Sequence, residues 1–413
     1  MTRPALLSLD DALPQLLAQA HALNASQTVS TFEADGRVLA QDVVAALQVP
    51  PQDNSSMDGY AVRAADCAQV GAVLRVTQRI PAGTHGSQLH AGEAARIFTG
   101  APIPPGADAV VMQEDCEVLD GTQVQVNKTV SAGQWVRRSG EDVTRGATVL
   151  SKGMRLTPAE LGLAASIGLA QLHVSARPRV ALFSTGDELV MPGDVAPDAM
   201  PAGAIYNSNR FFLRAMLQRL GCEVTDLGIV PDKRDATMAA LRDAAQHHDL
   251  ILTSGGVSVG EEDHIKPAVE SLGELNLWQL AIKPGKPFAY GKVSRGPVGD
   301  ACHFMGLPGN PVSSFVTFLL LVRPFVLALQ GVTTTTIART EMTAHFDWSR
   351  ADKRREFLRV KRNAQGGLDL FPNQSSGVLT SAVWGDGVVD NPAGQTIAKG
   401  DTVRFISFAE WLA

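Results

Sequence analysis

The alternation of hydrophobic and polar residues changes character along the chain and divides it into regions. Between residues 60 and 149, short apolar runs are separated by Gly, Pro and Asn turns, a pattern that predicts a compact all-β unit. From residue 178 to about 331, strand patterns alternate with helix patterns, as in a doubly wound α/β domain with mainly parallel strands. After residue 332, strand patterns return and predict a small β-barrel or sandwich.

Local signals predict individual elements within these regions. Ser8 followed by Asp11 resembles a capping box that opens an amphipathic helix reaching about Leu23. Alternating apolar positions predict a strand within residues 28–50. Thr157-Pro158 supplies an N-cap and a first-turn proline for a further helix.

The longest apolar run also predicts a helix. Asn310-Pro311 is suited to begin it, and the run from Val312 to Leu329 is interrupted by Arg323 and Pro324. These interruptions favour a buried helix over a membrane span. The N-terminal stretch has no apolar core, so we expect no signal peptide.

Composition narrows the function classes. Hydrophobic residues make up 45% and charged residues 19%, as in ordinary globular proteins, and a chain of 413 residues is expected to form several domains. The net charge of −6 provides no broad basic surface for nucleic acid. The four cysteines are scattered without a C-x-x-C pair, which argues against a zinc ribbon or a disulfide framework and fits a cytoplasmic protein.

The stretch from residue 250 to 266, LILTSGGVSVGEEDHIK, carries the clearest candidate chemistry. A short apolar strand ends in a glycine turn and leads to a helix, which creates a cradle of backbone N–H groups for an oxyanion. The acids that follow the turn would repel an anion unless a divalent cation or nearby lysines intervened, and Lys283 and Lys286 come shortly afterwards. An ordinary strand–helix turn with solvated acids would have the same spacing, so spacing alone leaves both interpretations open.

Other polar motifs fall at the ends of predicted strands. FSTGDEL, VPDKRD and GLPGNP join the glycine turn at the carboxyl edge of the α/β sheet, where such folds bind ligands. In the all-β region, FTGAPIPPGAD contains Thr99, and RRSGEDV contains Glu141 and Asp142. From sequence alone, rigid surface turns are the favoured explanation of these two segments.

Taken together, the motifs resemble a known family. Each motif is weak by itself, but their order along the chain is specific, and they extend densely from Asp53 to Pro311. They resemble the molybdopterin molybdenumtransferases, the molybdenum-insertion enzymes of molybdenum-cofactor biosynthesis, whose relatives include the E domain of gephyrin. The motifs in order are DNSSMDGYAVR, RIFTGAPIPPGADAVVMQE, RRSGEDV, FSTGDEL, TSGGVSVGEEDHIK, IKPGKPFAYG and GLPGNPVSSF.

The resemblance implies a multidomain α/β plus β fold and an elongated homodimer. Its active cleft would lie between the α/β domain of one chain and the β-rich insertion of the other. Its substrates would be adenylylated molybdopterin and molybdate, used with Mg²⁺, and its products molybdenum cofactor and AMP. Other molybdenum-cofactor biosynthesis proteins would be further partners. The implied domains are a discontinuous linker domain (1–50 and 141–177), a β-rich inserted domain (51–140), a molybdopterin-binding α/β domain (178–331) and a C-terminal β-barrel domain (332–413).

The resemblance also implies roles for individual residues. The glycine turn would cradle phosphate or dithiolene through Ser254, Gly255, Gly256 and Ser258. Carboxylates in the α/β domain would act in catalysis and hold the metal, namely Glu188, Asp232 and Asp263. Two lysines would bind molybdate or phosphate, Lys283 and Lys286, and two prolines would shape the rim, Pro308 and Pro311. The partner chain would complete the site with Asp58, Thr99 and Asp142.

Three other functions stay open at this point. A scaffold that binds receptor tails, as gephyrin-like proteins do, is disfavoured by the absence of an extended linker. The adenylyltransferase that precedes this step resembles only the α/β domain and would lack the flanking β-rich units. A paralogue that inserts tungsten is not separated by the sequence, because tungstate and molybdate have nearly the same size and charge.

Overall fold

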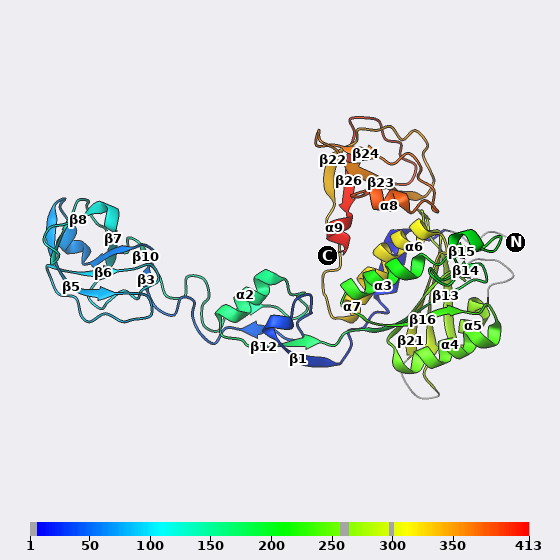
Figure 1. Cartoon of the computed structure of the whole chain (residues 1–413), viewed down its shortest axis with the longest axis horizontal. Coiled ribbons are helices and arrows are strands. Elements are labelled where there is room, and N and C mark those ends of the chain that lie inside the picture. The colour runs from blue at the N-terminus through cyan, green and yellow to red at the C-terminus, as the bar shows by residue number, and fades with distance from the viewer. Residues whose placement is uncertain (1–5, 257–263, 297–300, 413) are drawn as a thin grey trace.

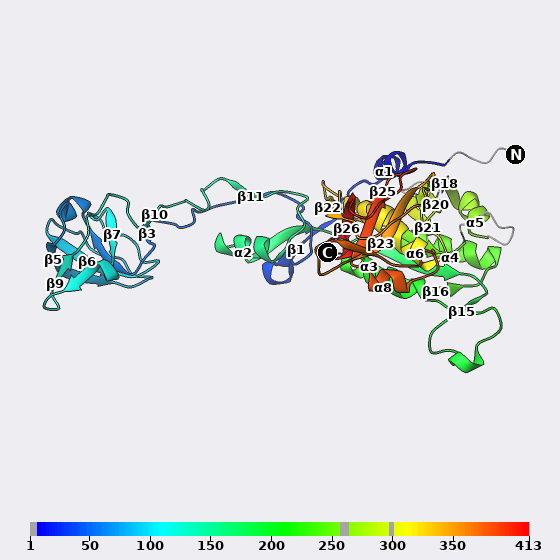
Figure 2. The same ribbon diagram turned by 90° about the horizontal axis from the view of Figure 1, so that it is seen from above.

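The protein is described here by a computed structural model that covers residues 6–256, 264–296 and 301–412. The chain forms an elongated molecule with a β-rich unit at one end and the α/β unit at the other (Figure 1). A small linker unit lies between them, and the C-terminal unit packs beside the α/β unit. The view from above shows the same separation (Figure 2).

The α/β unit is built on one six-stranded sheet with the order β16-β13-β17-β21-β20-β18. The first four strands in this order are parallel, and β20 runs antiparallel to both of its neighbours, β21 and β18. The predicted doubly wound domain is therefore confirmed, with the antiparallel pair β20 and β18 at its edge. The strands are β13 (Arg179–Thr185), β16 (Glu223–Val230), β17 (Leu250–Ser254), β18 (Gly273–Gln279), β20 (Pro287–Ser294) and β21 (Ala301–Leu307).

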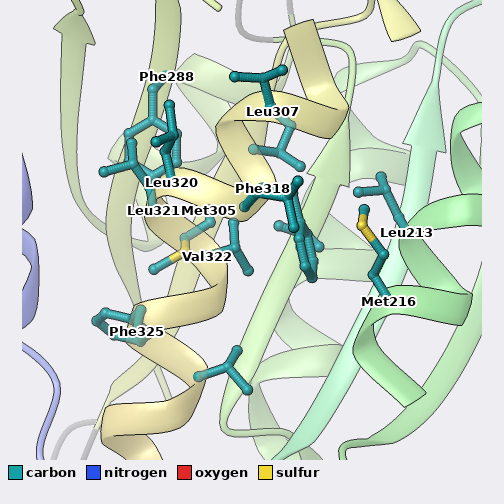
Figure 3. Close-up of a cluster of buried hydrophobic side chains, with 14 of the residues drawn as sticks. Leu213, Met216, Phe288, Met305, Leu307, Phe318, Leu320, Leu321, Val322 and Phe325 are labelled. Carbon is teal, nitrogen blue, oxygen red and sulfur yellow. The ribbon is translucent and has the colours of Figure 1, made fainter. Parts of the chain in front are cut away.

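Helices cover both faces of this sheet because its central strands are apolar on both sides. In β13, Val180 and Leu182 belong to one core, whereas Ala181 and Phe183 belong to the other. The first core is shown in Figure 3, where helix residues pack onto strand residues such as Met305. The first core is covered by α3 (Asn209–Arg219) and α6 (Pro311–Thr317), and the second by α4 (Arg234–His247) and α5 (Ile265–Leu272). After β13 come two short paired strands, β14 (Leu189–Val190) and β15 (Ile205–Tyr206), with the 3₁₀ turn η4 (Pro197–Ala199) between them.

The predicted long apolar helix is one continuous helical segment from Pro311 to Leu329. It is long and apolar enough to cross a membrane, but 89% of its most apolar window is buried in the structure. After α6 it widens into a π-helical turn, η5 (Phe318–Val322), and continues as α7 (Arg323–Leu329). Pro324 lacks an N–H and cannot extend a regular α-helix, so a wider turn in front of it accommodates the ring. The prediction of a buried helix is confirmed.

The N-terminal helix α1 (Leu9–Leu17) belongs to the α/β core. The Ser8 hydroxyl accepts a hydrogen bond from Asp11 N at 3.1 Å, as the capping signal predicted, although the helix ends at Leu17 rather than near Leu23. Its buried face lies in the core that also contains α7 and Trp411. We therefore propose that the linker unit begins after α1. The buried residues of α1 are Leu9, Ala12 and Leu16.

The linker unit consists of two short antiparallel ribbons and one helix. The single strand expected within residues 28–50 is divided, because η1 (Thr31–Glu33) and Gly36, with φ of +70°, turn the chain. The N-cap predicted at Thr157 is confirmed, since Thr157 N donates to the Glu160 carboxylate at 2.8 Å. The ribbons pair β1 (Ser26–Ser30) with β12 (Gln171–Ser175) and β2 (Val43–Val44) with β11 (Thr148–Leu150), and the helix is α2 (Pro158–Ser166).

The β-rich unit is the compact all-β unit that its turn spacing predicts. Its six-stranded sheet has the order β7-β4-β6-β5-β9-β8, and a two-stranded ribbon of β10 and β3 joins it to the linker unit. The strands are β3 (Asn54–Ser55), β4 (Gly59–Val62), β5 (Ala72–Ile80), β6 (Glu93–Ile97), β7 (Ala109–Met112), β8 (Cys116–Val118), β9 (Gln123–Val126) and β10 (Val136–Arg137), with short 3₁₀ turns η2 (Ala64–Cys67) and η3 (Gln113–Asp115).

The C-terminal unit has a sheet that continues into the α/β unit. Its order is β19-β23-β25-β26-β22, with β24 beside β23, and β19 (Ile282–Lys283) comes from the α/β chain segment. The sequence pattern predicted strands here but missed β25. The remaining elements are β22 (Thr340–Thr343), β23 (Arg355–Arg362), β24 (Leu368–Leu370), β25 (Gly387–Asn391), β26 (Thr402–Ser407), α8 (Thr380–Trp384) and α9 (Phe408–Leu412).

Candidate functional site

A cavity of about 540 Å³ opens at the carboxyl edge of the α/β sheet. It lies where β13, β17 and β21 end and where α6 begins. Several motifs that are distant in sequence contribute to its wall, as the shared sheet edge led us to expect. The predicted site residues that line it are Glu188, Asp232, Ser254, Gly255, Gly256, Pro308 and Pro311.

The glycine turn after β17 can be formed only by residues without a side chain. Gly255 and Gly256 have φ values of +91° and +68°, which side-chain-bearing residues rarely adopt. A Cβ on Gly256 would lie 2.5 Å from Ile265 Cδ1 and 2.8 Å from Thr185 Oγ1. Gly255 N donates to the Leu307 carbonyl at 3.0 Å, which fixes the turn to β21. The turn is therefore held tightly between β13, β21 and α5.

Asn209 is a wall residue whose role the sequence did not reveal. Its Nδ2 donates to Ser254 Oγ at 2.8 Å and to the Gly309 carbonyl at 2.7 Å. Before α3, Asn207 Oδ1 accepts a hydrogen bond from Arg210 N at 3.4 Å. Asn209 Oδ1 and Asn207 Nδ2 are buried in the described structure without a hydrogen-bond partner. Such atoms in a cavity wall suit a polar ligand.

Two carboxylate residues line the cavity. Glu188 is exposed on the loop after β13, and the half-buried Asp232 lies between β16 and α4. Carboxylate oxygens are the ligands that Mg²⁺ prefers, so this pair fits the implied metal. Within residues 6–256, 264–296 and 301–412, no group of three or more His, Cys, Asp or Glu side chains is arranged to hold a metal. Asp263 and Ser258 lie outside the described residues.

The two predicted anion-binding lysines differ in their surroundings. The ammonium of Lys283 lies 3.0 Å from Glu356 Oε1 and 3.5 Å from Asp352 Oδ2. Lys286 is exposed, and across the described parts of the chain no carboxylate pairs with its ammonium. The next residue, Pro287, lines the cavity. Of these two lysines, Lys286 is therefore the one whose charge no described carboxylate neutralises, and it precedes a residue of the cavity wall.

At the other end of the molecule, the structure brings Asp58 and Thr99 together. Asp58 Oδ1 accepts hydrogen bonds from the backbone N–H and from the hydroxyl of Thr99, each at 2.8 Å. These bonds, the backbone one foremost, lower the pKa of Asp58 below its usual value, so the carboxylate stays ionised. Asp142 is exposed in the segment that connects the β-rich and linker units, where Val49 and Val143 form a bridge.

A cationic stack that the sequence did not reveal adjoins the Asp58–Thr99 pair. The guanidinium carbons of Arg79 and Arg96 lie 4.6 Å and 4.7 Å from the ring centroid of Phe98. Arg96 also donates to the carbonyl of Gly59 at 2.9 Å. The only signal in the sequence is the arginine on each of two neighbouring strands. The stack gives this acidic protein a local positive surface beside Thr99.

Within one chain, the Asp58–Thr99 pair and the cavity are far apart. The strand β6, which leads to Thr99, lies at one end of the molecule next to β4, and β13 lies at the other (Figure 1). Figure 2 shows the linker unit between them from a second direction. The cavity and the Asp58–Thr99 pair of one chain therefore do not form a common site within that chain.

Comparison with known proteins identifies the family. The MoeA N-terminal region (domain I and II) matches residues 7–168, a probable molybdopterin binding domain matches 181–328, and the MoeA C-terminal region (domain IV) matches 341–408. The molybdopterin molybdenumtransferase of Haemophilus influenzae is 42% identical over 327 residues, which cover 79% of this chain and 78% of that protein. The chain belongs to the molybdopterin molybdenumtransferase family.

Two further proteins match this chain over nearly its whole length. The molybdopterin molybdenumtransferase of Synechococcus elongatus is 36% identical over 414 residues, covering 96% of this chain and 98% of that protein. The crystal structure of the molybdopterin biosynthesis MoeA protein from Pyrococcus horikoshii OT3 superposes with a TM-score of 0.84 at 27% identity, covering 98% of this chain and all of that one. The matched molybdopterin-binding domain contains the whole described cavity wall of this family member.

Proposed function

We propose that this member of the molybdopterin molybdenumtransferase family inserts molybdenum from molybdate into adenylylated molybdopterin. The reaction releases AMP, forms molybdenum cofactor and uses Mg²⁺. The observation that carries this proposal is the cavity itself, which combines a side-chain-free turn with two carboxylates at the edge of a domain matched as molybdopterin-binding. The names of the curated relatives support the same chemistry.

Each part of the cavity has a task in this proposal. The turn at Gly255 and Gly256 lets the pterin substrate approach the backbone closely. The unpartnered Asn209 Oδ1 and Asn207 Nδ2 hydrogen-bond the ligand and orient it. Lys286 attracts molybdate or the phosphate groups as a point charge.

The acidic residues complete the proposal. Glu188 and Asp232 would hold Mg²⁺, which when bound would neutralise charge on the phosphoanhydride. Because Asp58 and Thr99 lie far from the cavity of their own chain, we assign them, with Asp142, to the cavity of the second subunit in a homodimer. The proposal includes a cytoplasmic location, which the free thiol state of all four cysteines supports, and other proteins of cofactor biosynthesis as partners.

The test is release of AMP by the purified protein. Adenylylated molybdopterin is incubated with Mg²⁺ and molybdate, and AMP and protein-bound molybdenum are measured. We expect both only when molybdate and Mg²⁺ are present, and a chelator should stop the reaction. A parallel reaction with tungstate determines the oxyanion preference. Absence of AMP under every condition, with a folded dimer, would overturn the proposal and favour a scaffold.

A further inference from the structure

The turn from Lys283 to Lys286 connects three parts of the structure. At its start, β19 pairs in parallel with β23 of the C-terminal unit. In its middle, Gly285 lies against α6, where a Cβ would be 2.4 Å from Thr317 Oγ1. At its end, Pro287 lines the cavity. A displacement of this turn would therefore move the cavity rim.

An ion pair fixes the start of the turn. Lys283 Nζ lies 3.0 Å from Glu356 Oε1, and the Glu356 side chain is 1% exposed whereas that of Lys283 is 35% exposed. Glu356 Oε2 accepts from Trp348 Nε1 at 2.8 Å. A buried carboxylate that loses its cation is strongly unfavourable, so Glu356 depends on Lys283 for its charge balance. The ammonium of Lys283 is thus paired with a carboxylate of the C-terminal unit.

A second contact holds the opposite side of the rim. The backbone N–H of Val312, next to Pro311, donates to the Ser376 carbonyl at 2.9 Å. The segment around Ser376 is fastened by Arg359, a guanidinium 1% exposed that donates to the Ser375 carbonyl at 3.2 Å. The C-terminal unit therefore contacts the cavity rim at two places, β19 and the first turn of α6.

We propose that Lys283 and Glu356 are positioning residues, and that the C-terminal unit braces the cavity rim through them. The ion pair holds the turn so that Pro287 stays in the cavity wall, and Lys283 acts through this turn rather than on the anion. The expected changes in kcat rest on the proposed function. The expected changes in amide exchange do not depend on it.

The kinetic test compares Lys283→Gln, Glu356→Gln and the double variant. Each single change leaves one charge unbalanced, whereas the double change replaces the ion pair by two amides that can hydrogen-bond each other. We expect each single variant to lose about tenfold or more in kcat, with little change in KM for molybdate, and the double variant to recover most of that loss. If Lys283 binds the anion directly, the double variant will stay as impaired as Lys283→Gln. That outcome overturns the proposal.

The matched control is Lys292→Gln. Lys292 lies on the same hairpin in β20, and its Nζ is hydrogen-bonded to Gln19 Oε1 at 2.9 Å, away from Glu356. This variant should keep the wild-type kcat. If Lys292→Gln loses as much activity as Lys283→Gln, the effect is not specific to the Lys283–Glu356 ion pair. That outcome contradicts the proposal.

A structural readout separates this inference from the proposed function. Amide hydrogen exchange at Ile282, Lys283 and Val312 should accelerate in Glu356→Gln and not in Lys292→Gln. If Glu356→Gln does not fold, Asp352→Asn replaces it, with a smaller acceleration at the same amides because Asp352 lies 3.5 Å from Lys283 Nζ. Unchanged exchange refutes the brace. A wild-type protein that releases no AMP but shows the accelerated exchange refutes the proposed function alone.

Discussion

Asn209 donates a hydrogen bond to Ser254 Oγ at 2.8 Å and so ties the first turn of α3 to the end of β17. Its second bond, to the Gly309 carbonyl, ties both elements to the loop before α6. One side chain that is 7% exposed thus holds three segments of the cavity wall in register. The cavity wall therefore depends on this one buried side chain.

Replacing Asn209 with Ala should loosen this wall. Ser254 and Gly309 would each lose a buried donor, which we expect to lower the free energy of unfolding by about 1–3 kcal/mol. AMP release should fall with it, because the turn beside Ser254 would no longer be fixed. Urea denaturation and the AMP assay measure the two effects. Asn276→Ala, at an exposed position on β18, should change neither.

The glycine turn permits a controlled test of its crowding. Gly256→Ala adds a Cβ that meets Ile265 and Thr185, and it also imposes a left-handed φ on alanine. We expect a loss of about 3 kcal/mol or more in the free energy of unfolding. Gly203→Ala has a similar φ of +85° but nothing within 4 Å, so it should cost only about 1 kcal/mol. Equal losses in the two variants would show that the turn is not crowded.

The assignment of Asp58 to the second subunit can be tested by subunit exchange. Asp58→Asn and Asp232→Asn should each be inactive as homodimers. After random exchange, half of the dimers are mixed, and each mixed dimer has one cavity with neither change. Activity should return to about a quarter of wild type. A mixture that exchanges subunits, shown by mass-tagged chains, and stays inactive would place Asp58 outside the partner's cavity.

Lys286 should determine the response to molybdate. Lys286→Ala removes the cation that precedes the wall residue Pro287, so half-maximal AMP release should require about fivefold more molybdate, as expected for the loss of about 1 kcal/mol of attraction. High salt should reduce the difference between the variant and wild type. Lys399→Ala, at an exposed position of the C-terminal unit, serves as the control. If only binding of the nucleotide substrate weakens, Lys286 faces its phosphates rather than molybdate.

His303 should make stability depend on pH. Burial above all, and then the positive Lys292, lower the pKa of His303 to about 4, while the hydroxyl of Tyr290 is 3.0 Å from its Nδ1. The unfolded chain takes up this proton near pH 6.5 and the folded chain only near pH 4, so stability is full above pH 6.5 and falls as pH decreases towards 4. The expected loss is about 3 kcal/mol. His303→Gln should flatten this part of the curve of unfolding free energy against pH, and an unchanged slope would assign it to other groups.

Much of the fold could be read from local sequence signals. The alternation along 178–331 predicted the α/β sheet because its central strands are apolar on both faces. Proline and capping residues predicted where α2 and α6 begin. The motifs of the cavity were also visible, because the carboxyl ends of parallel strands meet at one edge of a sheet. The strand β25 was missed, since its residues Asp390 and Asn391 are polar yet buried by partners far away in sequence.

The sequence by itself determined most strands of the α/β sheet, which turns require glycine, and which family the motifs resemble, because these depend on backbone stereochemistry and local alternation. Only the tertiary structure decided the partners of individual side chains. It joined Asp58 to Thr99 and Asn209 to Ser254, and it turned Lys283 towards Glu356. The same residues at the same spacing could be exposed to solvent or paired with another side chain. Which of these occurs depends on the distant segments that the packed core brings within hydrogen-bonding distance.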